Sequence, residues 1–584
     1  MTAPTWNLEN IFPGGLQGEG FTTTMAEVEA SVDDLLARGD ALPELPDGLD
    51  GWADWLLEVD AVSRRLWQCG TFSHCLSCAD TNDRIASRAE SRVRATGSRL
   101  GRAWVVPEDH IANGTEAGVA ALLDHPRLQH MRPMLSRIRA NRALLLPMAE
   151  QQLVSELSED GLHGWGSLYD RLSGQLAVTI DGETVVATQA NNRLGSTDGA
   201  TRTAALGGLE DAWKGQEERC AQALSHIVGW RKVLNDRRGV DELADTLAAN
   251  RLSRDTLEAM MASAARQAPV LKRYMTAKAK LLGQEQLGWE DLSAPLDNPN
   301  SAQSWTVARS FIEEHFSSYH PELAGFAKRA FDGRWIEAED RASKRQGGWC
   351  AGVPLTGESR IFMTFGGTFR STVTLAHELG HAYHNWVCRD LAPSQRRITS
   401  TLAETASVFA ESLVRDAALK SADSRAIRLA MLDARLMAGV SFLMNIPARY
   451  AFERALYPMR RKGLLDPDAL TETMLACQKE AYQDHLSSWF PHFWSSKLHF
   501  YISGRSFYNY PYTFGYLFAQ LVYRQVLADG DHAAYVALLR RTGWDNSESI
   551  AQACLGLDLT KVETWDMAAA GLAEDLEAFL AEIG

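Results

Sequence analysis

Cysteine is scarce in this chain, and other features of exported or membrane-bound proteins are absent from the sequence. Eight cysteines occur among 584 residues, and the first ten residues have neither a basic start nor the apolar run of a secretory signal. We therefore expect free thiols and a cytoplasmic location, because disulfide-bonded scaffolds belong to oxidising compartments. No uninterrupted run of about 18 apolar residues is present, so no association with a membrane is expected.

The chain also has no basic stripe. Its formal net charge is −15, from 59 lysines and arginines against 74 aspartates and glutamates. Proteins that bind nucleic acid place clustered positive charge against the phosphates, so no nucleic-acid partner is expected. Low-complexity tracts and fixed-period repeats are not apparent in the sequence either.

Helical periodicity is what the sequence has in abundance. Apolar residues recur at three- and four-residue spacing over residues 22–38, 51–104, 116–160 and 200–240. This pattern predicts a mainly α fold. The chain is longer than one ordinary domain, and the polar segment 191–199 favours a boundary near residue 190. We expect an N-terminal helical lobe over residues 1–190 and a second, catalytic domain over residues 191–584.

Strand-like runs are few. Residues 175–187 alternate apolar and polar side chains around Asp181-Gly182, the composition of a tight hairpin turn. Residues 349–365 form a similar pattern with a turn near Gly357, and they end just before the most informative segment of the chain. A small β element is therefore predicted beside that segment.

The informative segment, residues 371–390, holds two histidines at a spacing that suits one metal ion. His377 and His381 are four positions apart, so both imidazoles project from the same face of a helix. Glu378 follows the first histidine and would project beside the ion, within reach of a water molecule there. This pattern is typical of zinc peptidases, in which the glutamate acts as general base.

A catalytic zinc site uses three protein ligands and leaves one position open. Glu404 is the candidate third ligand of a single zinc ion, because it lies in the next helical segment among small residues that permit close helix approach. A third histidine further along the first helix is not available, since that position is Val387. The competing interpretation of Glu404 is a solvent-facing carboxylate.

Two neighbours of these ligands have less certain roles in the sequence. His384, one turn after His381, is interpreted as a packing histidine rather than a ligand. Glu411, two turns after Glu404, is either a surface glutamate or an acceptor for the second nitrogen of a ligating imidazole.

These residue types predict hydrolysis of an amide bond. Zinc lowers the pKa of water from about 16 toward about 7, and Glu378 would take the proton and pass it to the leaving amine. The oxyanion that forms still needs hydrogen-bond donors. The tyrosine-rich segment 490–518 offers such donors, including His499 and Tyr508, although buried packing accounts for several of its aromatic rings.

Several segments, in order along nearly the whole chain, resemble one known family. They are WNLENIFPG at 6–14, WGSLYDRLSGQL at 165–176, GGWCAG at 347–352, TLAHELGHAYH at 374–384, LAETAS at 402–407, HFY at 499–501 and FYNYPYTFGYLF at 507–518. The chain is similar to the thimet oligopeptidase/oligoendopeptidase F family of zinc metallopeptidases, and to the oligoendopeptidase F branch in particular.

The resemblance implies a two-lobed, mainly α metallopeptidase with a deep central channel and a small β element beside the zinc helix. It implies an endopeptidase that hydrolyses internal bonds of short unfolded peptides. His499 would contact substrate, and Tyr510, or else Tyr508 or Tyr516, would stabilise the oxyanion. The resemblance also implies that residues 361–367 form an edge strand that pairs with the substrate backbone.

Two other functions stay open on sequence alone. A zinc exopeptidase would use the same metal ligands together with an added charge that recognises a peptide terminus. A non-enzymatic, peptide-binding helical scaffold would contain the histidine motif by coincidence. The sequence does not specify the oligomeric state.

Overall fold

The computed structural model describes residues 3–296 and 303–584. The chain forms two compact units, each assembled from segments that are far apart in sequence. Unit 1 comprises Met1–Arg142, Asn300–Lys420 and Val522–Gly556, and unit 2 comprises Ala143–Pro299, Ser421–Leu521 and Leu557–Gly584. The compact units do not follow a single division near residue 190, because the chain after that point contributes to both.

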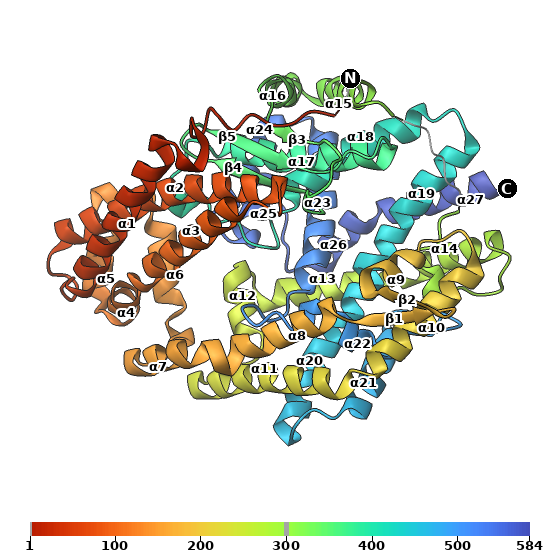
Figure 1. Ribbon diagram of the computed structural model, residues 1–584, viewed down its shortest axis with the longest axis horizontal. Coiled ribbons are helices and arrows are strands. Elements are labelled where there is room, and N and C mark those ends of the chain that lie inside the picture. Colours follow the sequence, from red (N-terminus) through yellow and green to blue (C-terminus); the bar gives the residue numbers. More distant parts are fainter. Residues whose placement is uncertain (1–2, 297–302) are drawn as a thin grey trace. The chain divides into compact units, whose positions relative to one another are not determined.

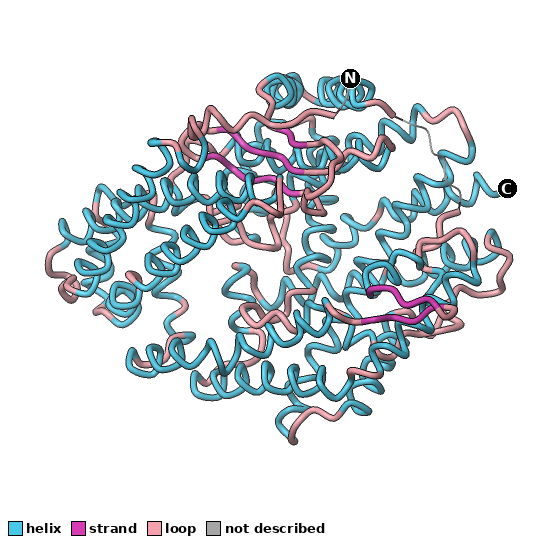
Figure 2. Tube along the Cα trace, in the orientation of Figure 1, coloured by secondary structure: helices cyan, strands magenta, loops and turns pink. Residues whose placement is uncertain are grey.

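Helices dominate both units, which confirms the predicted mainly α fold (Figures 1 and 2). Unit 1 contains α1 (Glu19–Asp40), α2 (Leu49–Ala79), α3 (Arg84–Arg102), α4 (Val105–Asn113), α5 (Glu116–Leu123), α6 (Arg132–Ala140), α15 (Trp305–Tyr319), α16 (Pro321–Asp332), α17 (Phe369–Val387), α18 (Thr405–Ser421), α24 (His532–Arg541) and α25 (Ser547–Leu555).

Unit 2 is helical to the same degree, and the chain returns to unit 1 within α23 (Tyr510–Asp529). Its helices are α7 (Met148–Ser158), α8 (Gly164–Gly174), α9 (Ala187–Arg193), α10 (Gly199–Lys214), α11 (Glu217–Arg238), α12 (Ala244–Asn250), α13 (Arg254–Arg266), α14 (Ala268–Leu281), α19 (Arg425–Val440), α20 (Ile446–Lys462), α21 (Pro467–Ala481), α22 (Phe493–Ser496), α26 (Val562–Ala569) and α27 (Gly571–Ile583).

The periodic region 51–104 is interrupted once in the structure. Helix α2 ends at Ala79 and α3 begins at Arg84, because the Asp83 side chain accepts hydrogen bonds from the backbone N–H groups of Ile85 and Ala86. An aspartate in this position satisfies donors that have no partner within the helix, and so marks a helix start. Apolar periodicity continues across the cap and does not reveal it.

Both predicted hairpins are present. Strands β1 (Ala177–Ile180) and β2 (Glu183–Val186) pair antiparallel in unit 2, with Ile180 opposite Glu183. Asp181 and Gly182 between them have φ of 52° and 82°, the left-handed conformations that a two-residue hairpin turn requires. In unit 1, β4 (Trp349–Val353) and β5 (Glu358–Phe362) pair in the same way.

The sheet of unit 1 corrects one expectation. Its strand order is β3-β5-β4, so β5 is the central strand and not an edge. Strand β3 (Ile336–Glu337) pairs with it in parallel, and the backbone N–H of Met363 donates to the Glu337 carbonyl at 2.9 Å. The implied edge strand over 361–367 is therefore wrong for its first residues, because a distant segment occupies that side.

Helix α17 packs on this sheet through both β4 and β5 (Figure 1). Its N-cap is Thr368, whose side chain accepts from the Ser371 backbone N–H. Leu375, Ala376 and Leu379 are fully buried along the helix. The predicted β element therefore lies beside the helix that holds the histidine motif.

One helical stretch within the described residues, Arg425–Lys462, is long and apolar enough to cross a membrane by length and composition alone. Its mean hydropathy over the most apolar window is 1.4, and 50% of that window is buried inside the protein. Leu432, Leu436 and Leu443 are among its buried side chains. Such burial is that of a helix in a protein interior.

Candidate metal centre

His377, His381 and Glu404 come together in unit 1. The two histidines lie one turn apart on α17, and Glu404 directly precedes α18. One potential ligand atom from each residue lies within 4.8 Å of the others. The Glu404 Oε2 atom is 3.2 Å from His377 Nε2 and 3.4 Å from His381 Nε2, while the two imidazole planes cross at 85°. Three donor atoms thus point into one small volume.

Gly380 allows the backbones of α17 and α18 to come close together beside the histidines. A Cβ atom at Gly380 would lie 2.4 Å from the Ala406 carbonyl oxygen and 2.6 Å from the Ser407 Cα atom. Real Cβ atoms do not approach backbone so closely, so only glycine fits between the two histidines. The histidine motif does not by itself reveal this role of Gly380, although glycine in the middle of a helix is a signal of close backbone approach.

Hydrogen bonds orient the first histidine. His377 Nδ1 donates to Glu411 Oε2 at 3.1 Å, and Arg415 Nε donates to the other oxygen of Glu411 at 2.6 Å. Of the two interpretations of Glu411, the imidazole acceptor is therefore the one that the structure supports. The bond leaves His377 Nε2 facing Glu404, and a carboxylate in this position fixes the tautomer of a metal-binding imidazole.

The charges around His377, His381 and Glu404 favour the binding of a metal cation or a proton. Burial disfavours the charged form of His377, but hydrogen bonds to Glu404 and Glu411 outweigh it and raise its pKa to about 10. Burial also opposes ionisation of Glu404, yet the bonds from His377 and His381 hold the pKa of Glu404 well below its ordinary value. The cluster therefore attracts positive charge, and a metal ion would compete with protons for the same lone pairs.

Glu378 lies beside these ligands in a confined position. Its side chain is 5% exposed, and Oε2 has no hydrogen-bond partner among the described residues. Its Oε1 lies 3.0 Å from the point that a Cβ atom at Gly348 would occupy. Burial raises the pKa of Glu378, against the opposing charges of His381 and His377. A buried carboxylate oxygen without a partner is suited to accept a proton from a water molecule.

The residues fit a zinc ion on their donor chemistry. Two imidazole nitrogens and one carboxylate oxygen are the protein ligands of many hydrolytic zinc sites, which keep one further position open. The orphaned Oε2 of Glu378 marks where an additional polar group would be accommodated. His384 is not part of this set, because its Nε2 contacts Thr542 Oγ1 at 2.7 Å and the Leu539 carbonyl at 3.1 Å.

A second group of the same composition occurs in unit 1. His320, Glu322 and His532 also place potential ligand atoms within 4.8 Å of one another. Their two imidazoles are stacked, however, with centroids 3.7 Å apart and planes at 15°. An imidazole binds a metal in its own ring plane, so two nearly parallel rings do not converge on one ion.

The candidate substrate residues belong to unit 2. His499 Nε2 lies 3.3 Å from the Tyr512 hydroxyl, and the ring of Tyr508 stacks on His499 with a centroid distance of 5.9 Å. Tyr508 is partly buried, and its hydroxyl has no hydrogen-bond partner in the part of the chain that the structure describes. Tyr512 was not singled out from the sequence, because nothing distinguishes it there from its neighbouring tyrosines.

Tyr510 and Tyr516 lie differently. Tyr510 is fully buried, and its hydroxyl bonds to Thr246 Oγ1 at 3.2 Å and to Asn250 Nδ2 at 3.1 Å. A buried, engaged phenol is poorly placed to meet a substrate. Tyr516 is partly buried and stacks on Phe442 at a centroid distance of 4.8 Å.

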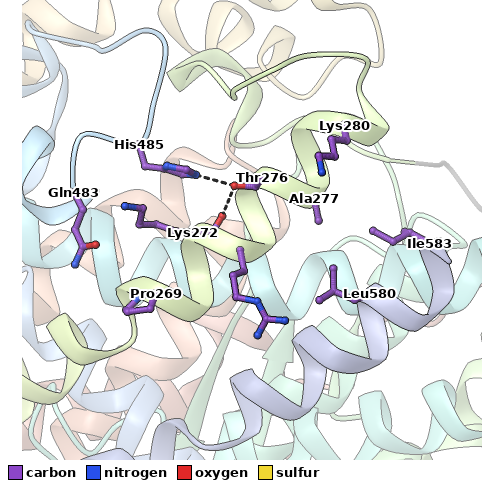
Figure 3. A pocket seen from close by; sticks show the side chains of 10 residues that line it. Pro269, Lys272, Thr276, Ala277, Lys280, Gln483, His485, Leu580 and Ile583 are labelled. Carbon is purple, nitrogen blue, oxygen red and sulfur yellow. Dashed lines mark hydrogen bonds between the residues drawn. The ribbon is translucent and has the colours of Figure 1, made fainter.

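A cavity of about 630 Å³ in unit 2 has no such chemistry (Figure 3). Its lining includes Lys272, Arg273 and Lys280, and His485 is its single histidine. His485 Nε2 bonds to Thr276 Oγ1 at 3.0 Å. None of the residues lining it is a carboxylate or a cysteine, so this cavity does not compete as a metal site.

Comparisons with known proteins identify the family of this chain. The model of Peptidase family M3 matches residues 195–569, and that of Oligopeptidase F matches residues 111–177. Oligopeptidase PepF of Bacillus subtilis (strain 168) is 23% identical over 602 residues, which cover 98% of this chain and 86% of the relative. Group B oligopeptidase PepB of Streptococcus agalactiae is 23% identical over 591 residues, covering 96% of this chain and 94% of the relative.

A solved structure shares the fold. The crystal structure of oligoendopeptidase-F from Enterococcus faecium matches with a TM-score of 0.70 at 18% identity, covering 96% of this chain and 98% of that one. The family match covers more than half of the chain and includes the histidine motif and the tyrosine-rich segment. This protein therefore belongs to Peptidase family M3 and is a metallo-oligopeptidase that acts on short peptides.

Proposed function

We propose that this oligopeptidase is a zinc-dependent endopeptidase that hydrolyses internal bonds of short unfolded peptides. One observation carries the proposal: the convergence of His377, His381 and Glu404 within 4.8 Å, beside a buried carboxylate that lacks a partner among the described residues. One zinc ion would be held by these three side chains. When bound, it would polarise the scissile carbonyl and make a water molecule acidic at neutral pH.

The chain's own residues do the rest of the chemistry. Glu378 Oε2 accepts the proton of the attacking water, and its raised pKa keeps that proton available for the leaving amine. Glu411 holds the ring of His377 through Nδ1, and Arg415 in turn holds Glu411. The ring of His377 is thereby fixed before substrate arrives, which lowers the cost of reorganisation during the reaction.

For the oxyanion donor we favour Tyr508 over Tyr510, the first choice from sequence. The hydroxyl of Tyr510 is buried and engaged with Thr246 and Asn250. Tyr508 stacks on His499 and keeps a hydroxyl without a partner among the described residues. Tyr508→Phe should lower kcat by about 10²-fold with a small change in KM, as loss of one oxyanion donor does. Tyr510→Phe should lower the free energy of unfolding instead; the reverse pattern would restore Tyr510.

The direct test of the proposed function uses one peptide blocked at both ends. Wild-type enzyme should cut it internally, a chelator should abolish the cleavage, and added zinc should restore it. Mass spectrometry of the products identifies the bond. The alternative, a zinc exopeptidase with the same metal ligands, predicts no cleavage of the blocked peptide and removal of residues from an unblocked one.

The cytoplasmic location belongs to the same proposal. It is supported by the sparse use of cysteine and by the eight cysteines, all of which are free thiols in the structure. Fractionation of cells that express the full chain, followed by activity measurement in each fraction, tests it.

A further inference from the structure

Two basic side chains in unit 2 contact one aromatic ring, and a histidine lies close enough for their charges to act on it. The guanidinium carbon of Arg449, on α20, lies 5.1 Å from the centroid of Phe493, and Lys497 Nζ lies 4.6 Å from the same centroid. His499 follows on the short helix η8 (Leu498–Phe500). We call Arg449, Lys497 and His499 the Phe493 cation cluster.

No carboxylate among the described residues forms an ion pair with a side chain of this cluster. Within residues 3–296 and 303–584, neither the Arg449 guanidinium nor the Lys497 ammonium group makes a hydrogen bond or an ion pair. Arg449 Nε and His499 Nδ1 are buried atoms without a partner among those residues. Glu453, one turn along α20, acts on Arg449 through its charge alone, because its carboxylate accepts a hydrogen bond from Asn509 Nδ2 at 2.7 Å and makes no ion pair with Arg449.

The basic groups destabilise one another. Burial, with the charge of Arg449, lowers the pKa of Lys497 to about 7. Burial, with the charges of Arg449 and Lys497, lowers the pKa of His499 to about 4. Burial lowers the pKa of Arg449 to about 10. Grouping partly buried basic side chains without an ion-pair partner is unfavourable, and the chain has acidic residues in excess at a net charge of −15.

The cavity of Figure 3 shows the usual arrangement in the same unit. Arg273 in its lining pairs with Glu577 at 2.9 Å, and both side chains are well exposed. This guanidinium therefore has both a carboxylate partner and access to solvent. In the Phe493 cation cluster no carboxylate among the described residues pairs with the basic nitrogens, so a carboxylate from outside the chain can become that partner.

We propose that the Phe493 cation cluster binds a carboxylate group of the peptide substrate, an inference that rests on the proposed function. The planar guanidinium of Arg449 matches the two oxygens of a carboxylate, and Lys497 adds a second charge-assisted hydrogen bond. Phe493 provides the apolar floor that both cations already contact. A peptide offers this group at its C-terminus and in aspartate or glutamate side chains, and the cluster suits both.

Binding of four peptides to full-length, zinc-loaded Glu378→Gln protein tests this inference without turnover. The peptides combine a free or amidated C-terminus with an internal aspartate or asparagine, and titration calorimetry gives each Kd. A carboxylate should tighten binding about 10- to 100-fold, the range of charge-assisted hydrogen bonds. Tighter binding of peptides with a free C-terminus than of amidated ones would identify the ligand as the C-terminal carboxylate. Tighter binding of the aspartate peptides than of the asparagine peptides would identify it as an acidic side chain.

Variants then locate the effect. Lys497→Met and Arg449→Met, each added to Glu378→Gln, should reduce the preference to less than about 2-fold, whereas Lys497→Arg should retain it. The matched control is Lys272→Met, which removes a lysine of the Figure 3 cavity and should keep the full preference. Equal binding of all four peptides overturns the inference, and so does a preference that survives both methionine variants.

Two further measurements separate the possible failures. Because Lys497→Met removes repulsion, its thermal midpoint should be no lower than that of the parent protein, and folding is thereby checked. Hydrolysis of the peptide blocked at both ends by wild-type protein, with and without chelator, tests the proposed function alone. Loss of carboxylate preference with intact hydrolysis refutes only the carboxylate site.

Discussion

Among the described residues, unit 1 contains two groups of two histidines and one glutamate, and the two groups differ in ring orientation and in hydrogen-bond partners. In the first group, His377 and His381 have planes that cross at 85°, and both face one oxygen of Glu404. In the second, His320 and His532 are stacked at 15°. The orientation of the rings, and not the identity of the residues, decides whether lone pairs can meet at one ion.

The partners of the rings differ as well. His377 gives only its Nδ1 to a protein acceptor, Glu411, and keeps Nε2 for the cluster. Both nitrogens of His532 contact tyrosine hydroxyls, at 3.1 Å to Tyr319 and 3.0 Å to Tyr383. The second group is therefore a hydrogen-bonded packing element. The comparison leads to four predictions, ordered from the largest effect to the smallest.

The largest difference should appear on removal of one histidine from each group. His381→Ala should lose stoichiometric zinc and lower activity by at least about 10³-fold, because a metal site with two ligands does not hold its ion. His320→Ala should keep both zinc and activity. Elemental analysis after gel filtration measures the metal, and zinc loss in His320→Ala would contradict the distinction between the groups.

The two glutamates beside the rings should differ next. Glu378→Gln should retain zinc and lower kcat by about 10²- to 10⁴-fold, since glutamine cannot accept the proton of the attacking water. Glu322→Gln changes a carboxylate of the second group and should leave kcat within about 2-fold. Steady-state kinetics on one blocked peptide measures both; comparable rates for Glu378→Gln and wild type would remove Glu378 from the mechanism.

Glu411 should affect zinc affinity more than the chemical step. Glu411→Gln weakens the acceptor for His377 Nδ1 and should lower zinc affinity by about 10- to 100-fold. Competition with a fluorescent chelator gives the affinity, and excess zinc should restore most of the activity. Glu322→Gln serves again as the control and should leave the affinity unchanged; an equal loss in both variants would count against the role of Glu411.

The smallest effect concerns His384, which shares α17 with the first group. Burial lowers its pKa to about 4, from about 6.5 in an unfolded chain. Between pH 6.5 and pH 4 this histidine is protonated in the unfolded state but neutral in the native state. The free energy of unfolding therefore falls as the pH drops from about 6.5 to about 4. The loss is about 3 kcal/mol. Urea unfolding of the chelator-treated protein across this range measures it.

The control for this pH dependence is His384→Gln, which has no titrating group at that position. Its free energy of unfolding should change less between pH 6.5 and pH 4 than that of wild type. An identical slope for the two proteins would assign the acid sensitivity to other groups. His381→Ala, tested in parallel, should keep the wild-type slope if His384 is responsible.

Local patterns in the sequence were sufficient for part of this account. The helical periods, the Asp181-Gly182 turn and the four-residue spacing of His377 and His381 depend on neighbours within a few positions, and the structure contains the elements they predicted. The structure also brings Glu404 to these histidines, as expected from small residues in its segment. The role of Gly380 was not foreseen, because it depends on a backbone more than twenty residues away.

The sequence by itself determined which segments are helices or strands, the histidine motif and the family resemblance, because each depends on the spacing of nearby residues or on residue identity. Tertiary structure alone decided which elements share a compact unit, that β5 is central, that Tyr510 is engaged, and that only one histidine pair is crossed rather than stacked. The physical reason is that burial, ring orientation and unpaired charge arise from contacts between distant segments, which no local pattern specifies.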